Sequence, residues 1–146
     1  MTQIMTLRDV KKSYSVGNSI FRRNRKVVRA VDGIDLEILE GQTLGIVGES
    51  GCGKSTLGRM MVRLEDLSSG QINFAGHDLF KIKGRKLREL RRDFQMVFQD
   101  PYASLNPRRN IGSIVEEPLR IHGYSREERE RIARDLLQKV GLDENA

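Results

Sequence analysis

The stretch that most constrains the fold is residues 48–56, with the sequence Gly-Glu-Ser-Gly-Cys-Gly-Lys-Ser-Thr. An apolar run at 44–47 precedes it, and a helix-compatible segment at 56–64 follows. Spaced glycines let successive backbone N–H groups face an anion without a Cβ in the way, and a helix N-terminus favours negative charge. The pattern therefore predicts a strand, a phosphate-binding loop and a helix in that order, and hence binding of a nucleoside triphosphate.

Individual residues of this loop have distinct predicted roles. Lys54 can reach the outer phosphates as a point charge, and the Ser55 hydroxyl can coordinate Mg²⁺. Cys52, the single cysteine, fits either as a small residue in tight backbone or as a thiol activated by the positive potential of the loop. An ordinary glycine-rich turn is the alternative interpretation. The predicted nucleotide-binding residues are Gly48, Glu49, Ser50, Gly51, Cys52, Gly53, Lys54, Ser55 and Thr56.

The bulk composition indicates the class of protein. At 146 residues, with 38% hydrophobic and 32% charged residues, the chain suits one globular domain with a buried core. No apolar run approaches the roughly 20 residues that span a bilayer, and the N-terminus has no secretion-signal pattern. A single cysteine forms no internal disulfide, which agrees with a reducing cytoplasm. The two histidines, His77 and His122, are far apart, so we expect no metal-ligand cluster.

The formal net charge of +6 comes largely from two basic groups. Such groups can bind nucleic acid or an anionic membrane face. For the second group we favour a solvated helix face, because Leu87 and Leu90 interrupt it at helical spacing and no aromatic residues alternate with its charges. The first group is Arg22, Arg23, Arg25 and Lys26, and the second is Lys81, Lys83, Arg85, Lys86, Arg88, Arg91 and Arg92.

Apolar and β-branched runs, bounded by turn residues, predict several short strands. Asp32-Gly33 predicts a tight turn between two of them, and Glu40-Gly41 predicts a second turn. Residues 17–25 are polar and basic, which is typical of an extended hairpin loop. The predicted strands are 5–10, 27–31, 34–39, 44–47, 71–74 and 94–98.

The last third of the chain has a different pattern. Pro101, Pro107 and Pro118 are expected to bound an irregular stretch. Ser125 and Glu128 then predict a capping box for an amphipathic helix that ends near Gly141. Early antiparallel strands, followed by a strand, loop and helix, indicate a mixed α/β fold.

The segment 96–101, Met-Val-Phe-Gln-Asp-Pro, resembles the Q-loop of ATP-binding-cassette (ABC) transporter ATPases. Gln99 stands 45 positions after Lys54, at the end of a predicted strand, as in that family. The longer string at 98–108, the form of the loop at 48–56 and the Val-Arg-Ala-Val-Asp-Gly string at 28–33 are similar to the branch that imports dipeptides, oligopeptides and nickel. The resemblance covers essentially all 146 residues.

The resemblance implies a P-loop NTPase core of ABC type with an N-terminal antiparallel β subdomain, and a helical subdomain that begins within about 103–146. It also implies that the loop amides and Lys54 hold the β- and γ-phosphates of ATP, that Ser55 ligates Mg²⁺ and that Thr56 supports the α-phosphate. Gln99 is then expected to reach Mg²⁺ or the attacking water, since an amide orients water without adding charge. A polar residue at the end of a strand is the alternative role for Gln99.

Tyr14 resembles the aromatic residue that stacks on adenine in this family, because a flat ring makes π contact with a base. Phe21, in the basic insert, could reach the same place, and core packing is the remaining alternative for Tyr14.

The sequence also departs from the family. The family continues with a Ser-Gly-Gly-Gln signature, an apolar strand that ends in Asp-Glu, and a switch histidine. Residues 142–146, Leu-Asp-Glu-Asn-Ala, contain none of these, and no apolar strand precedes Asp143-Glu144. We therefore expect the chain to be the N-terminal part of a longer ATPase, an incomplete fold that exposes the apolar strand at 44–47.

The leading functional hypothesis is an ATP-binding subunit that couples ATP binding and hydrolysis to import of small peptides. The expected partners are membrane permease subunits, a second ATP-binding subunit and, indirectly, an extracytoplasmic substrate-binding protein. The expected location is the cytoplasmic face of the membrane, with no nucleic-acid partner. The alternatives are a nickel importer, a soluble ABC ATPase that acts on nucleic acid, and a P-loop kinase or GTPase, which the early antiparallel strands disfavour.

We predict that this chain alone binds nucleotide weakly and does not hydrolyse ATP. In the family, hydrolysis also needs the acidic strand and the signature segment of a partner subunit. Phosphate release by the purified 146-residue chain is the measurement. ATPase activity that Lys54→Ala abolishes would contradict the prediction.

Overall fold

The computed structural model describes residues 2–16, 26–100 and 105–142, which divide into two compact units, Met1–Met96 and Val97–Ala146. Phe21, most of the first basic group, the Q-loop residues 101–104 and the acidic pair at 143–144 lie outside the described residues. The first unit contains an antiparallel sheet, two helices and the predicted phosphate loop, whereas the second contains two helices.

Four strands form the sheet of the first unit, in the order β2-β1-β3-β4. The central strand β1 (Gln3–Val16) pairs antiparallel with β2 (Lys26–Leu39) on one side and with β3 (Ser69–Phe74) on the other. The two-residue strand β4 (His77–Asp78) completes the sheet beside β3. These pairings confirm the predicted N-terminal antiparallel subdomain and the predicted strands at 5–10 and 71–74.

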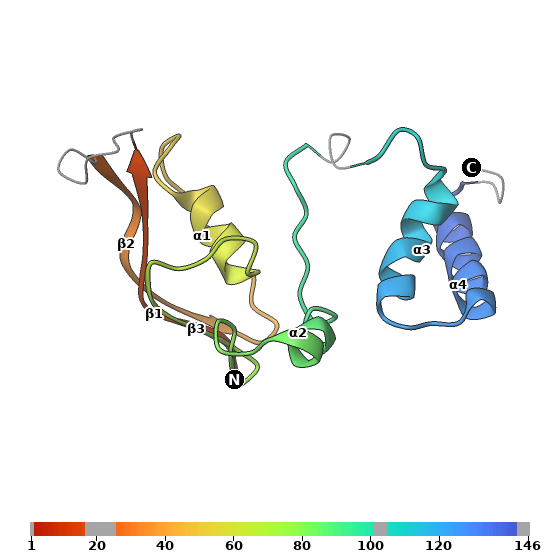
Figure 1. The fold of residues 1–146 in the computed structure, drawn as a ribbon, viewed down its shortest axis with the longest axis horizontal. Helices are drawn as coiled ribbons and strands as arrows, with labels where there is room; N and C mark the ends of the chain where they lie inside the picture. Colours follow the sequence, from red (N-terminus) through yellow and green to blue (C-terminus); the bar gives the residue numbers. More distant parts are fainter. Residues whose placement is uncertain (1, 17–25, 101–104, 143–146) are drawn as a thin grey trace. The chain divides into compact units, whose positions relative to one another are not determined.

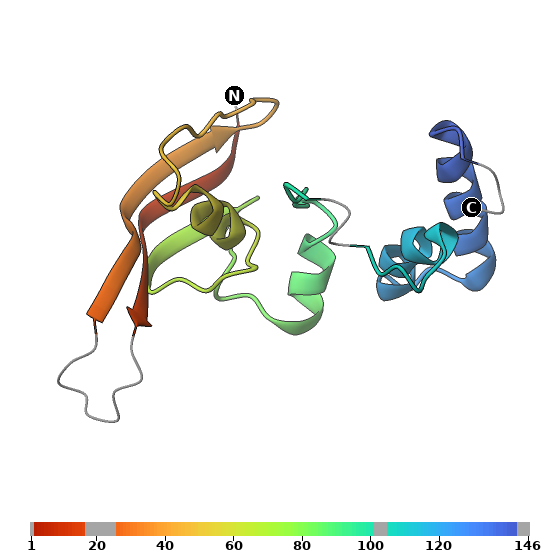
Figure 2. The same cartoon turned by 90° about the horizontal axis from the view of Figure 1, so that it is seen from above.

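One face of the sheet buries a core against helix α1 (Lys54–Met61), as Figures 1 and 2 show. Because side chains alternate across a strand, apolar residues of β1 and β3 gather on this face. Leu57 and Met60 of α1 lie one helical turn apart and pack onto the same cluster. The buried cluster is Met5, Leu7, Val10, Val31, Leu57, Met60, Ile72, Phe74, Leu79 and Leu90.

The predicted turn at Asp32-Gly33 is wrong, because these residues lie inside the continuous strand β2. Gly33 adopts a positive φ of 74°, and the pairing shifts there from Val10↔Ile34 to Lys11↔Asp32. The glycine is thus the extra residue of a β-bulge, which uses the same left-handed backbone that a tight turn would need. The Asp-Gly pair at 32–33 is therefore compatible with a β-bulge as well as with a tight turn. The Glu40-Gly41 turn is confirmed by a Gln42 N–H bond to the Leu39 carbonyl (3.2 Å).

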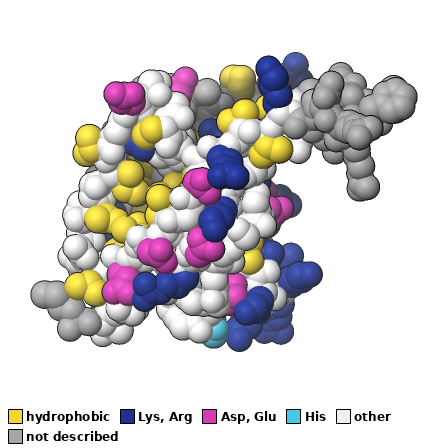
Figure 3. All heavy atoms as spheres, turned by 90° about the vertical axis from the view of Figure 1, so that its left-hand side faces the viewer, with side chains coloured by type: hydrophobic (Ala, Val, Ile, Leu, Met, Phe, Trp, Pro, Cys, Tyr) yellow, Lys and Arg dark blue, Asp and Glu magenta, His cyan; other side chains and the backbone are white. Residues whose placement is uncertain are grey.

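The predicted strands at 44–47 and 94–98 are also wrong, since neither segment joins a ladder among the described residues. Several of their apolar side chains are exposed, with Val47 at 95%, Val97 at 86% and Ile46 at 43%. Figure 3 shows hydrophobic side chains on the surface of the face that it presents. A strand needs a neighbour to accept and donate its backbone hydrogen bonds, and apolar composition alone supplies none.

Helix α2 (Gly84–Leu90) confirms a helix with the predicted apolar side, since Leu90 is buried. In the second unit, α3 (Ile111–Ile121) and α4 (Arg126–Lys139) pack together. Pro118 lies inside α3, so the irregular stretch that the prolines were expected to bound ends at Asn110 instead. The Asn110 side chain accepts the Ser113 N–H (2.8 Å), a cap that starts the helix despite the later proline.

The capping box of α4 is confirmed in both directions. The Ser125 Oγ accepts the Glu128 N–H (3.3 Å), and the Ser125 N–H donates to Glu128 Oε2 (2.9 Å). The hydrogen bonds from the Ser125 amide and then from its hydroxyl hold the pKa of the Glu128 carboxyl below its usual range. Gly141, just beyond the helix, has the positive φ of 76° that a helix C-terminus favours.

Gly70→Ala should destabilise the sheet, because Gly70 has a φ of 95° and a Cβ there would come within 2.7 Å of the Val10 Cα on the paired strand. We expect the free energy of unfolding to fall by about 3 kcal/mol. Gly76→Ala is the matched control, since Gly76 also has a positive φ but has open space around the added Cβ. We expect it to cost about 1 kcal/mol from backbone strain alone. Urea unfolding of both variants checks this, and equal losses would contradict the role of the close approach.

Candidate functional site

The phosphate loop at 48–56 is closed on itself by the side chain of Lys54. The Lys54 Nζ donates to the carbonyl oxygens of Gly48 (2.7 Å) and Glu49 (2.6 Å), at the start of the same loop. It also lies 3.6 Å from the Sγ of Cys52. The loop is therefore a ring of backbone with an ammonium group bound to its carbonyls, a positive charge already present where the sequence predicts anion binding.

The three glycines of the loop serve three different steric needs. Gly51 has a φ of 79° with open space around it, so only its backbone conformation requires glycine. Gly48 makes room for a side chain, since a Cβ would lie 2.8 Å from the Cys52 Sγ. At Gly53 both the backbone conformation and the lack of space require glycine. Its φ is 98°, and a Cβ would collide with the carbonyl oxygen of Ala30 and lie 3.3 Å from the carbonyl carbon. The Cys52 thiol is exposed and lies beside the Gly48 backbone.

Ala30, which the sequence analysis missed, is the extra residue of a second bulge in β2. The register passes from Lys12↔Val31 to Ser13↔Arg29, which leaves Ala30 without a partner on β1. Bulges redirect the backbone locally and often occur beside functional sites. Here the bulge places the Ala30 carbonyl against Gly53, and so fixes where α1 begins. The only sequence signal for this bulge is a small residue, Ala30, within a valine-rich run.

Helix α1 presents free backbone amides to the loop. Its first backbone bond runs from the Leu57 N–H to the Gly53 carbonyl (2.9 Å), so the N–H groups of residues 54–56 have no acceptor within the helix. Its first turn contains no acidic residue that would neutralise the positive end of the helix dipole. Ser55 is exposed and Thr56 half-buried at this end. The arrangement suits a multiply charged oxyanion such as a phosphate.

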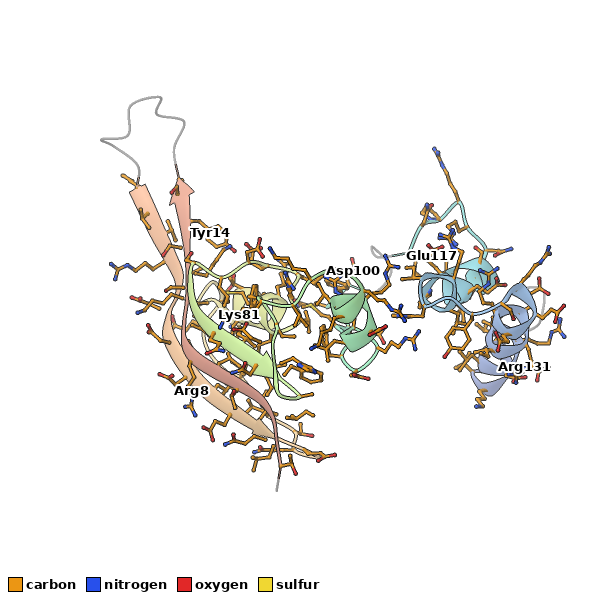
Figure 4. All side chains as sticks on the ribbon, turned by 60° about the horizontal axis from the view of Figure 1, so that its bottom comes forward. Arg8, Tyr14, Lys81, Asp100, Glu117 and Arg131 are labelled. Atoms are coloured by element: carbon orange, nitrogen blue, oxygen red, sulfur yellow. The ribbon has the colours of Figure 1, made fainter. Side chains whose placement is uncertain are left out.

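Tyr14 lies on β1, on the face of the sheet that α1 covers (Figure 4). Lys12, two residues earlier on the same face, places its Nζ 5.0 Å from the Tyr14 ring centre and 2.6 Å from a Glu65 carboxylate oxygen just after α1. The hydrogen bond from Lys12 chiefly lowers the pKa of the Glu65 carboxyl, and a bond from Tyr14 adds to this effect. The Tyr14 ring remains 37% exposed, so it is held in place with part of its surface free.

The register of the sheet relates Tyr14 to the phosphate loop. Tyr14 is paired with Val28, and Val28 is two residues from Ala30, whose carbonyl faces Gly53. Two residues span roughly 7 Å along a strand. Val28, which pairs with Tyr14, and Ala30, which faces the loop, are therefore close to each other on β2. The sequence signal for Lys12 as a support of Tyr14 is its same-face position two residues earlier.

A cavity of about 390 Å³ adjoins the loop, between β2 and α1. Apolar side chains line much of it, together with the charged residues Arg29, Asp32 and Lys54; the apolar ones include Val31, Ile34, Ile46, Val47 and Leu57. Such apolar walls suit packed side chains rather than phosphates. The hollow is open to solvent, because Val47 and Ile46 are 95% and 43% exposed, and the groups suited to bind an anion are the amides and the ammonium of the loop.

Gln99 is exposed and belongs to the second unit, so the structure describes it separately from Lys54. Among the described residues, no three His, Cys, Asp or Glu side chains gather as a metal site, and no helix is long and apolar enough to cross a membrane. The candidate site in the first unit therefore consists of the phosphate loop, with the Ser55 hydroxyl at the start of α1, and the Tyr14 ring on β1.

Comparison with solved structures places this fold among ATP-binding cassettes and confirms the predicted α/β class. The chain is 28% identical to the ATP-binding cassette MJ0796 in its dimeric post-hydrolysis state bound to ADP and Pi, with a TM-score of 0.75. The match covers 95% of this chain and 58% of that one. A second dimeric structure of MJ0796, a bacterial ABC transporter cassette, gives a TM-score of 0.76.

The sequence relatives confirm the resemblance to peptide importers. The chain is 50% identical over 141 residues to the oligopeptide transport ATP-binding protein AppF of Bacillus subtilis, and the match covers 95% of the chain and 43% of AppF. It is 45% identical over 143 residues to the di/tripeptide transport ATP-binding protein DppF of Pseudomonas aeruginosa, and this match covers 97% of the chain and 44% of DppF. The chain thus spans less than half the length of these relatives. The sequence model of the ABC transporter family matches residues 31–146, and the chain therefore belongs to that family.

Proposed function

We propose that this chain is the nucleotide-binding part of an ABC subunit that uses ATP to drive import of small peptides. The observation that carries the proposal is the loop geometry: the Lys54 ammonium is held on the carbonyls of Gly48 and Glu49, and the amides of 54–56 have no acceptor within α1. The same fold in MJ0796 holds ADP and Pi, and the relatives AppF and DppF are named for peptide transport. These likenesses support ATP as the nucleotide and peptides as the transported class.

In this proposal each loop residue keeps its predicted role. Lys54 exchanges its two carbonyl partners for the outer phosphate oxygens, and the amides of Gly51, Gly53, Lys54 and Ser55 donate to the same group. Ser55 supplies one hydroxyl to Mg²⁺, which fits an ion that takes the rest of its ligands from phosphates and water. When bound, Mg²⁺ neutralises charge that develops on the phosphates.

Tyr14 is proposed as the adenine platform. Its ring lies on the α1 side of the sheet and is partly exposed. Its partner on β2, Val28, is two residues from Ala30, the bulge residue that contacts Gly53. The distance of roughly 7 Å along the strand suits the span from a base to the phosphates that extend from its ribose. The Lys12–Glu65 ion pair fixes the ring, which lowers the entropy lost on stacking.

The remaining roles concern partners. Gln99 is proposed to act on the cation or the attacking water once two ATP-binding subunits close, and the unit from Val97 onward is proposed as the start of the helical subdomain. Permease subunits, and through them an extracytoplasmic binding protein, complete the proposed assembly at the cytoplasmic face of the membrane. The dimer in the MJ0796 structures supports the pairing of ATP-binding subunits.

Lys54→Ala should weaken binding of a fluorescent ATP analogue by tenfold to 100-fold, because it removes a charge-assisted hydrogen bond to phosphate. Fluorescence titration of the 146-residue chain measures the Kd. Lys139→Ala, in the last turn of α4, is the control and should leave the Kd unchanged. Equal affinity in the Lys54→Ala and parent chains would refute the proposed function.

Tyr14→Ala should weaken the same binding about tenfold, since base–aromatic stacking contributes about 1–3 kcal/mol. Tyr14→Phe keeps the ring and loses only the hydroxyl that bonds to Glu65. It should therefore stay within about twofold of the parent Kd. Similar losses in the two variants would show that the hydroxyl, rather than the ring, supports the nucleotide.

A further inference from the structure

We propose that residues 81–92, the basic segment, form a docking surface for the headgroups of anionic phospholipids. The segment contains seven Lys and Arg residues and one acidic residue, Glu89. All seven cationic side chains are exposed, Lys81 among them (Figure 4). The proposal rests on the proposed function only for the location of the chain beside a membrane.

The core holds the basic segment rigidly at both ends. At one end Leu79 is fully buried, and the Arg63 guanidinium donates to the carbonyls of Leu79 and Ile82 (2.6 Å each). At the other end Leu90 is buried, and the Phe94 ring packs edge-to-face on Phe74 at 5.2 Å. The cations between these anchors therefore form a fixed array on the surface of the first unit.

Cations stand at both ends of α2: Arg88, in the last turn, agrees with the helix dipole, whereas the two in the first turn oppose it. Arg85 and Lys86 occupy its first turn, at the positive end of the dipole, and its N-cap is Lys83, which makes no side-chain cap. Arg88 and Arg91 are like charges three positions apart. In contrast, α4 has Glu127 and Glu128 in its first turn. Cations placed against the local electrostatics indicate an external anionic partner.

Several of these cations are available to such a partner. Arg85 pairs with Glu89 (2.8 Å) and Lys81 with Asp78 (3.1 Å). Lys86, Arg88 and Arg91 form no ion pair with any acid in the described part of the chain. An anionic lipid surface attracts an array of unpaired Lys and Arg through many weak, additive contacts.

Lipid headgroups fit this surface better than nucleic acid does. Single-stranded nucleic acid is bound largely by stacking its bases on aromatic side chains, and residues 81–92 contain none. The flanking aromatic residues, Phe80 and Phe94, pack against the core instead. A flat sheet of phosphates with no bases is the anion that the array matches.

Vesicle co-sedimentation of the 146-residue chain tests the proposal. The chain should bind vesicles of equal parts phosphatidylglycerol and phosphatidylcholine, and not vesicles of phosphatidylcholine alone. The combined change Lys86→Gln, Arg88→Gln and Arg91→Gln should weaken binding about 100-fold, at roughly fivefold per cation. The matched control, Arg120→Gln, Arg126→Gln and Arg131→Gln, removes the same charge from residues paired with acids, and should weaken binding less than about fivefold.

Equal binding to both kinds of vesicle, equal losses in the two triple variants, or tighter binding to a single-stranded oligonucleotide than to the anionic vesicles would overturn the proposal. Raising NaCl from about 0.05 M to about 0.5 M should release the parent chain from the vesicles, a test that needs no variant, and retention would count against the surface. Affinity for the fluorescent ATP analogue should be the same in the α2 triple variant and the parent. That readout separates loss of lipid docking from failure of the nucleotide site.

Discussion

The close contact between Gly53 and the Ala30 carbonyl is the constraint on which the site depends. It requires a residue with no Cβ, in left-handed backbone, at the point where the loop becomes α1. The bulge in β2 supplies the other side of the contact. Together they fix the start of α1 against the sheet, so the direction of its free amides and the distance to Tyr14 are both set by backbone rather than by adaptable side chains.

Because the backbone is fixed, Lys54 can complete the site before any ligand arrives. Its ammonium forms two hydrogen bonds to carbonyls of its own loop, so the charge is compensated and the loop is held as a ring. A phosphate must displace these bonds, and it replaces neutral acceptors with charged ones, which are stronger. The exchange should need little reorganisation, since the amides of 54–56 already have no acceptor within α1.

Much of this could be predicted from sequence wherever a local pattern had one structural meaning. The phosphate loop and the Ser125–Glu128 capping box are of this kind, because their residues satisfy one another over a few positions. Asp32-Gly33 was misassigned because left-handed backbone serves a bulge as well as a turn. Pro118 was misassigned because it loses a single backbone bond, which packing of α3 on α4 outweighs. The strand prediction at 44–47 was wrong for a non-local reason, because an apolar run becomes a strand only where a neighbouring strand pairs with it.

The starts of α1, α2 and α4 show how electrostatics separate structural from functional surfaces. In α4, Glu127 and Glu128 neutralise the positive end of the helix dipole, so these charges stabilise the helix itself. α1 leaves that end without acids and adds Lys54, which destabilises the empty helix and favours an anion. α2 also lacks acids there and adds Arg85 and Lys86. A domain with a net charge of +6 gains solubility from scattered cations, but only cations that oppose the local dipole cost stability. By that criterion α1 and α2 both place cations against the helix dipole. The Lys54 ammonium is bound by loop carbonyls and Arg85 pairs with Glu89, whereas Lys86 has no acidic partner in the described part of the chain and can be compensated by an external anion.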